Sequence, residues 1–216
     1  MRPKMVKICG ITQALDAQYC IDQGADALGF IFHPQSPRNL SFENFREIQN
    51  QLDFKSCLKI AVAVAPQPAL VQELISLGFE KFQFHFSLDI PLLEIRKWSE
   101  LVGAENLWLA PRMKADDELP KAFFDEADTF LLDTYSKKTY GGTGEVSDWA
   151  KYLKLKHQYF KHRWVLAGGL GPNNLEHALS TNIPDGVDLN SGVESSPGIK
   201  DTDKIDRVFA ILKSSK

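Results

Sequence analysis

The sequence predicts one α/β domain over residues 1–216, a closed (β/α)8 barrel of the TIM type. One reason is that short, β-rich apolar runs alternate with helix-period segments along the whole chain. The other is the count, because eight such pairs share 216 residues, about 27 for each strand, helix and their connections. An open doubly wound sheet is the alternative, and it usually has fewer strands. Its dinucleotide-binding form carries G-x-G-x-x-G after the first strand, where this chain has Gly10-Ile11-Thr12.

The composition agrees with a globular domain and excludes other classes. Hydrophobic residues make up 44% and charged residues 25% of the chain, which excludes a disordered, collagen-like or coiled-coil protein. A net charge of −3 offers no general positive field for nucleic acid or an anionic membrane. The longest apolar stretches, such as Ile60–Ala65, are too short to cross a bilayer, and Met1–Gly10 does not resemble a signal peptide.

The three cysteines, Cys9, Cys20 and Cys57, have neither the number nor the spacing of a disulfide framework or a zinc ribbon. No cluster of His, Cys and Asp indicates a metal site. We therefore expect a cytoplasmic protein without a metal or other cofactor, which binds neither nucleic acid nor a membrane. The sequence leaves the oligomeric state open, with a monomer favoured.

The eight expected strands are mostly continuous apolar runs, which is typical of parallel strands covered on both faces. In chain order they are Val6–Cys9, Ala27–Phe32, Leu58–Ala65, Lys81–His85, Leu107–Ala110, Thr129–Asp133, Trp164–Ala167 and Val187–Asn190.

Helices are expected between the strands because apolar residues recur there at spacings of three and four. Thr12 and Ser41 are candidate N-caps, Pro68 and Pro172 suit first helical turns, and Gly24 stands where a helix would stop. In chain order the expected helices are Thr12–Gln23, Ser41–Gln51, Pro68–Ser76, Pro91–Trp98, Leu119–Glu126, Asp148–Lys156, Pro172–Ser180 and Asp203–Lys213.

Reactive side chains stand at the expected C-terminal strand ends, where barrels of this kind place their active sites. Cys9 ends the first strand and Asp133 the sixth. A cysteine can act as a base once a cationic environment stabilises its thiolate, and a carboxyl group can act as an acid where burial raises its pKa. The two residues are therefore candidates for proton transfer. The alternatives are a small buried apolar residue at Cys9 and a capping or solvated carboxylate at Asp133.

Two further side chains could contact a substrate. Arg38 follows the second strand in a loop stiffened by Pro37, and its fork geometry suits a substrate carboxylate or, alternatively, a surface salt bridge. His85 ends the fourth strand and could bind substrate or serve a structural purpose.

Glycine-rich connections follow the last three strands. Backbone amides can approach a phosphate closely only where no Cβ intervenes, and barrels frequently bind phosphate after strands seven and eight. Simple tight turns are the alternative interpretation. The candidate phosphate-binding residues are Gly142 and Gly144 after the sixth strand, Gly168 and Gly169 after the seventh, and Ser191 and Gly192 after the eighth.

The ordered motifs resemble the phosphoribosylanthranilate isomerase family over nearly the whole chain. They include Lys7–Thr12, Ser36–Arg38, Leu131–Asp133, Leu166–Leu170 and Val187–Glu194.

Three places depart from the family pattern. Phe86 stands where glycine is frequent, which puts the role of His85 in question, and Asn190 stands where a small serine is usual. The fifth strand ends in Pro111-Arg112, a variable region that implies nothing about the site.

The resemblance implies a cofactor-free Amadori rearrangement in tryptophan biosynthesis. The substrate would be a phosphosugar joined to anthranilate, N-(5-phospho-β-ribosyl)anthranilate, and the product 1-(2-carboxyphenylamino)-1-deoxyribulose 5-phosphate. Asp133 corresponds to the family's general acid, Cys9 to its general base and Arg38 to the arginine near the anthranilate carboxylate. Asp188 lies on a matching motif and is expected to contact substrate, as is His85, while the glycine turns hold the phosphate.

Two other functions remain open from the sequence. A ring-closing enzyme such as indoleglycerol-phosphate synthase would call for a lysine acid at a strand end, and no lysine ends the first four expected strands. A barrel that only binds a phosphorylated ligand would be favoured by loss of Cys9 or Asp133, and both are present.

Overall fold

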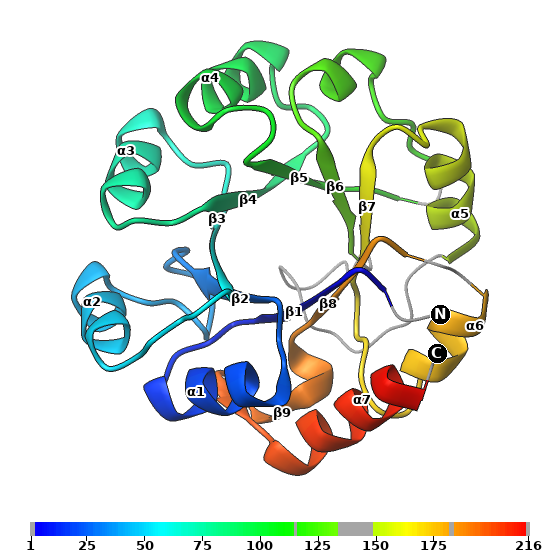
Figure 1. Cartoon of the computed structure of the whole chain (residues 1–216). Helices are drawn as coiled ribbons and strands as arrows, with labels where there is room; N and C mark the ends of the chain where they lie inside the picture. The colour runs from blue at the N-terminus through cyan, green and yellow to red at the C-terminus, as the bar shows by residue number, and fades with distance from the viewer. Residues whose placement is uncertain (1–2, 115, 134–148, 182–183, 215–216) are drawn as a thin grey trace.

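The computed structural model describes residues 3–114, 116–133, 149–181 and 184–214. Eight parallel strands form a closed barrel in chain order, and pairing of the first strand with the eighth completes the ring (Figure 1). The predicted (β/α)8 fold is therefore confirmed. The strands are β1 (Met5–Cys9), β2 (Ala27–Ile31), β3 (Leu58–Val64), β4 (Lys81–Ser87), β5 (Leu107–Arg112), β6 (Thr129–Leu132), β7 (Arg163–Leu166) and β8 (Gly186–Leu189).

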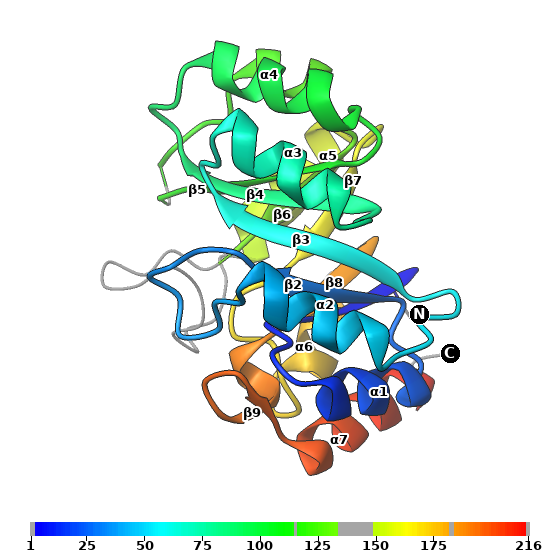
Figure 2. The ribbon, with the colours of Figure 1, turned by 90° about the vertical axis from the view of Figure 1, so that its left-hand side faces the viewer.

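Helices surround the strands, as Figures 1 and 2 show from two directions. They are α1 (Ala14–Gln23), α2 (Phe42–Asn50), α3 (Pro68–Ser76), α4 (Leu92–Val102), α5 (Trp149–Gln158), α6 (Leu175–Thr181) and α7 (Thr202–Ser214). Between β5 and β6 stands a 3₁₀ helix (Lys121–Asp125) in place of the expected helix Leu119–Glu126. After β8 a 3₁₀ turn (Ser191–Val193) leads into a hairpin of β9 (Glu194–Ser196) and β10 (Ile199–Lys200).

Several local signals act as the sequence predicts. The Ser41 hydroxyl accepts a hydrogen bond from the Asn44 amide at the start of α2. Pro68 occupies the first turn of α3, and Gly24 ends α1 with a φ of +100°. Each signal works because it satisfies helix-end backbone groups or fits the required backbone angles.

Two expected helix starts are wrong. Gln13 is the N-cap residue of α1, while Thr12 donates its hydroxyl proton to the Gly198 carbonyl of the distant hairpin. Similarly, α6 begins at Leu175 and not at Pro172. The Asn174 side chain accepts from the Gly171 amide and donates to the Gly169 carbonyl, so it fixes a loop where a first helical turn was expected.

The apolar core has two parts, as expected for a barrel with an outer helical layer. The larger part lies between the strands and the helices. The smaller part fills the barrel and includes Cys9, Ile60, Trp108 and Val165. In the part of the chain that the structure describes, no helix is long and apolar enough to span a membrane.

Candidate active site

A pocket opens at the C-terminal ends of the strands and gathers most of the predicted site residues. Gly192 follows the pocket-lining Ser191, whereas Gly142 and Gly144 lie outside the described residues. The predicted residues that line the pocket are Cys9, Arg38, His85, Asp133, Gly168, Gly169, Asp188 and Ser191.

Lys7 lies beside Cys9 and Asp188 and was not among the predicted site residues. Two residues before Cys9, it shares the same face of β1, and the strand register sets it opposite Asp188 on β8. Its Nζ donates to both carboxylate oxygens of Asp188 at 2.9 Å, and none of the Lys7 side chain is exposed. Burial lowers the pKa of Lys7, but the charges of Asp188 and Cys9 outweigh this effect and raise it above its ordinary value.

Cys9 is a buried thiol in a charged environment. Burial raises its pKa, because a thiolate loses hydration inside the protein. The ammonium group of Lys7 opposes that shift through its charge and a side-chain hydrogen bond, whereas Asp188 adds to it. The net direction is upward, so the thiol form is favoured at neutral pH, and Lys7 favours the thiolate.

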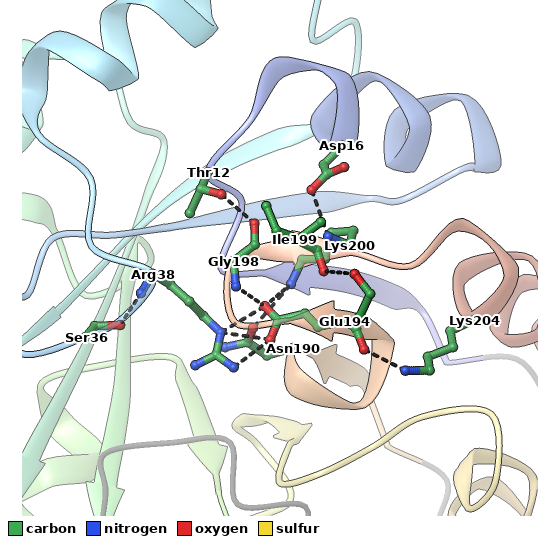
Figure 3. A network of polar contacts seen from close by, with 11 residues as sticks. Thr12, Asp16, Ser36, Arg38, Asn190, Glu194, Gly198, Ile199, Lys200 and Lys204 are labelled. Carbon is green, nitrogen blue, oxygen red and sulfur yellow. Dashed lines mark hydrogen bonds and ion pairs between the residues drawn. The ribbon is translucent and has the colours of Figure 1, made fainter.

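Arg38 is held in a fork by Glu194 (Figure 3). Its Nε donates to Glu194 Oε1 at 2.8 Å and its Nη2 to Oε2 at 2.6 Å. Glu194 Oε1 also pairs with Lys200 Nζ at 2.9 Å, and all three side chains are buried. Among the described residues no acceptor takes the Nη1 hydrogens of Arg38, which lines the pocket. The expected salt bridge of Arg38 therefore exists, but it is buried and not at the surface. The Nη1 end of the guanidinium stays available to bind a molecule in the pocket.

Burial raises the pKa of Glu194, but the hydrogen bond from Arg38 and the charge of Lys200 outweigh it and lower the pKa overall. Burial lowers the pKa of Lys200, which Glu194 opposes. Glu194 therefore remains a carboxylate that binds two cationic side chains.

The β9–β10 hairpin that carries Glu194 is anchored to the start of the barrel (Figure 3). Thr12 Oγ1 donates to the Gly198 carbonyl at 2.5 Å, and the Lys200 amide donates to Asp16 Oδ2 at 2.8 Å. Gly10, with a φ of +74°, lets the chain pass close to this cluster. A Cβ there would lie 2.5 Å from Asn190 Oδ1 and 2.7 Å from Arg38 Cδ.

His85 faces the pocket as a neutral imidazole. Burial, together with the nearby charge of Lys7, lowers its pKa to about 4. One ring nitrogen, Nε2, lies 2.8 Å from the Gln83 amide nitrogen and can accept its hydrogen. Phe86 does not disturb this placement, because it turns outward and packs against Trp98 and Phe123.

Asn190, another departure from the family pattern, joins the charged network. Its side-chain oxygen accepts from Lys200 Nζ at 3.2 Å, and the residue lines the pocket. A serine here would have a shorter reach, so the asparagine fits the position of Lys200 in this chain.

The glycine loops after β7 and β8 pack tightly together. Gly168 and Gly169 have φ angles of +96° and +62°, which glycine adopts readily. A Cβ on Gly192 would collide with the Leu170 carbonyl of the neighbouring loop. Gly192 thus has a packing requirement of its own, beside any contact with phosphate.

Sequence reasoning missed four residues that contact the predicted site residues. They are Lys7, Gln83, Glu194 and Lys200. Alternation along β1 could have found Lys7, because residues two apart share a strand face. Glu194 closes the motif Val187–Glu194, but nothing local indicates its bond to Arg38, 156 residues away.

Among the described residues, no group of three or more His, Cys, Asp or Glu side chains is arranged to hold a metal ion. Lys7 is paired with Asp188, Glu194 with Arg38 and Lys200, and His85 is hydrogen-bonded to Gln83. The arrangement can bind anions and move protons between a thiol, a carboxyl group and a bound molecule.

Comparisons with known proteins identify the family of the chain. A family model described as N-(5'phosphoribosyl)anthranilate (PRA) isomerase matches residues 6–210. The N-(5'-phosphoribosyl)anthranilate isomerase of Aquifex aeolicus is 38% identical over 210 residues, covering 97% of this chain and 98% of that protein. The corresponding protein of Gloeothece citriformis is 39% identical over 210 residues, covering 96% and 93%.

Solved structures give the same result. The crystal structure of phosphoribosyl anthranilate isomerase from Thermus thermophilus matches with a TM-score of 0.81 at 32% identity, covering 98% of this chain and 100% of that one. A phosphoribosyl anthranilate isomerase in complex with reduced 1-(o-carboxyphenylamino)-1-deoxyribulose 5-phosphate matches with a TM-score of 0.75 at 30% identity, covering 97% and 98%. On its fold, its pocket and these full-length matches, the chain belongs to the phosphoribosylanthranilate isomerase family.

Proposed function

We propose that this protein converts N-(5-phospho-β-ribosyl)anthranilate into 1-(2-carboxyphenylamino)-1-deoxyribulose 5-phosphate, a step of tryptophan biosynthesis. The observation that carries the proposal is one pocket lined by Cys9, Asp133, Arg38 and the glycine loop after β7. In this proposal these residues supply a base, an acid, a cation and a backbone site for phosphate. The related isomerase that binds a reduced deoxyribulose phosphate supports the same class of ligand.

Asp133 is the general acid in this proposal. Its carboxyl group gives a proton to the furanose ring oxygen as the bond from that oxygen to C1 breaks. The anthranilate nitrogen supplies the electron pair, and the open form is an iminium ion. Asp133 directly follows β6, so it stands at the strand end where barrel chemistry is located.

Cys9 is the general base. Its thiolate takes the proton from ribose C2, and the C2–H electrons form a C1–C2 double bond that neutralises the iminium. The enolamine then loses its hydroxyl proton and gains a proton at C1, which gives the ketone. Oxidation at C2 balances reduction at C1 within one molecule, so no external oxidant or reductant is needed.

The remaining residues hold the substrate in this scheme. Arg38 binds the anthranilate carboxylate with the part of its guanidinium that Glu194 leaves available. The loops at Gly168, Gly169 and Ser191 bind the phosphate through backbone amides, with Gly142, Gly144 and Gly192 as further candidates. His85, as a neutral imidazole, exchanges a hydrogen bond with the sugar, and Asp188 contacts the substrate where it lines the pocket.

The proposal places the reaction in the cytoplasm. The free thiols of Cys9, Cys20 and Cys57 agree with a reducing compartment.

The test is rescue of a tryptophan-requiring bacterial strain that lacks this isomerase step. We expect growth without tryptophan, and purified protein should convert phosphoribosylanthranilate in a fluorescence assay. A folded protein that binds the product in calorimetry but neither rescues growth nor converts substrate would be a binding barrel, contrary to the proposal.

A further inference from the structure

Lys7 is a buried lysine whose ammonium group lies beside Asp188 and near Cys9 in the site. Two N–H groups of its ammonium bind the two oxygens of Asp188, each at 2.9 Å. The ammonium of Lys7 and the thiol of Cys9 also act on each other, since each shifts the pKa of the other. An ammonium group has three donors and no acceptor, and Asp188 accounts for two of them.

Gly29 makes the approach of Lys7 to Cys9 possible. The register of β1 and β2 sets Gly29 opposite Cys9. A Cβ built on Gly29 would lie 2.7 Å from Cys9 Sγ and 2.9 Å from Lys7 Nζ. The sulfur and the ammonium therefore occupy the space that a side chain on β2 would fill. Gly29 adopts no positive φ, so its lack of a side chain serves this close approach and no unusual backbone angle.

The structure assigns Lys7 a positioning role, in which its ammonium group is the counter-ion that stabilises the thiolate form of Cys9. This inference rests on the proposed role of Cys9 as base. Asp188 holds the ammonium in place and neutralises it while Cys9 is a thiol. When Cys9 loses its proton to solvent, the ammonium is shared between a carboxylate and a thiolate at close range.

The other charged groups that act on Cys9 fit this assignment. Lys200 favours the thiolate through its charge, and Arg38 also interacts with the charge of Cys9. Asp188 disfavours the thiolate, but its effect ranks below that of Lys7. His85 is neutral and adds no charge. Lys7 therefore gives the largest opposition to the upward effect of burial on the pKa of Cys9.

The test measures the rate of Cys9 alkylation by iodoacetamide against pH, with mass spectrometry of the Cys9 peptide. The midpoint of this curve reports thiolate formation, because the thiolate is the nucleophile. Burial raises the pKa of Cys20 and of Cys57 to about 12, so these thiols stay protonated over the working range. The readout needs no substrate, so it is independent of isomerase activity.

In Lys7→Met we expect the midpoint to rise by at least about one pH unit, the lower end for removal of a close opposite charge. Gly29→Ala keeps every charge but inserts a methyl group between Sγ and Nζ, so its midpoint should rise by a smaller amount. Gly186→Ala is the matched control. Its Cβ would meet mainly the flexible end of Met5, away from Cys9, and its midpoint should equal that of the wild type.

Thermal unfolding establishes which variants fold. Gly29→Ala decides the question if Lys7→Met fails to fold, because the three atoms nearest to the new methyl group belong to the side chains of Cys9 and Lys7 and none to the backbone. Folded variants with wild-type midpoints would overturn the assignment. A shifted midpoint in a protein that converts no phosphoribosylanthranilate would uphold the Lys7–Cys9 interaction and refute the proposed function instead.

Discussion

Two buried ion clusters border the pocket, and they differ in charge balance. The inner pair, Lys7 and Asp188, lies inside the barrel and matches one cation with one anion. The rim cluster, Arg38, Glu194 and Lys200, lies where the hairpin meets the β2 loop and holds two cationic side chains around one carboxylate. With Lys200 protonated, the rim cluster carries one surplus positive charge. The inner pair carries none.

The difference in charge balance agrees with the proposed roles, in which the rim cluster binds substrate and the inner pair assists proton transfer. A surplus charge suits a partner that is always anionic, such as a substrate carboxylate. A balanced pair suits a group that is neutral at rest and becomes an anion only for part of the reaction, such as Cys9. Because buried charges are costly unless they are paired, the charge of each cluster suits the anion that it would meet in the proposed mechanism.

The largest expected effect comes from removing the two groups that transfer protons in the proposed mechanism. Cys9→Ala and Asp133→Asn should each lower turnover by at least about 10²-fold, the low end for loss of a general acid or base. Fluorescence assays of purified protein measure this. Cys57→Ala, which alters a buried thiol outside the pocket, should stay near the wild-type rate. Wild-type turnover in Cys9→Ala would contradict the view that the balanced inner pair accommodates a reacting thiolate.

Breaking the inner pair comes next. Asp188→Ala leaves the Lys7 ammonium buried without its carboxylate, which should lower the free energy of unfolding by roughly 3–5 kcal/mol. Urea unfolding measures the loss. The control is Asp22→Ala, which removes a solvent-exposed partner of Lys55 and should cost no more than about 1 kcal/mol. Equal losses in the two variants would mean that the burial of Lys7 is not balanced by Asp188.

The rim cluster is tested by Arg38→Lys, which keeps the charge but loses the fork. A single ammonium cannot hold Glu194 and also present a planar pair of donors to a substrate carboxylate. We expect KM to rise by about tenfold, with a smaller change in kcat, since a binding contact is weakened. Arg96→Lys, at an exposed ion pair on α4, should leave both constants unchanged. A fall in kcat alone would place Arg38 in the chemical step.

The smallest effect is a pH dependence of stability that distinguishes the two regions. His85, near the inner pair, has its pKa lowered from 6.5 to about 4, so between these values the unfolded chain binds a proton that the folded protein does not. The free energy of unfolding should therefore fall as pH decreases through this window. Glu194 in the rim cluster has its pKa lowered from 4.5, so its contribution is lost only at lower pH.

Urea unfolding from about pH 7 to about pH 5 measures this slope. His85→Gln should flatten it, whereas His157→Gln, at an exposed position on α5, should not. An unchanged slope in His85→Gln would show that mild acid acts elsewhere in the molecule.

The fold was predictable because each βα unit carries local sequence signals for its strand and its helix. The strands from Ala27 and Leu58 are apolar runs, and Ser41 and Pro68 mark helix starts by their own chemistry. The error at Thr12 has a different origin. Its hydroxyl bonds to Gly198, a partner that only the finished fold brings near.

The same distinction applies to the site. Strand-end side chains such as Cys9 and His85 follow from the barrel, since its geometry brings all strand ends to one face. Their electrostatics do not follow, because Lys7 and Asp188 are 181 residues apart in the chain. Likewise, Glu194 limits what Arg38 can bind, and no local pattern near residue 38 indicates it.

Closure of the ring between β1 and β8 has a consequence for protein synthesis. A nascent chain exposes Lys7 and Arg38 early, but their carboxylate partners are translated near the end, on β8 and in the hairpin. Until those segments leave the ribosome, neither cation has its partner and the first strand has an unpaired edge. Contacts between such distant segments are slow to form, because closing a long loop costs entropy. Chains truncated before residue 186 lack β8 and the hairpin, so they are unable to complete the pocket. The site therefore forms only after β8 and the hairpin have been synthesised.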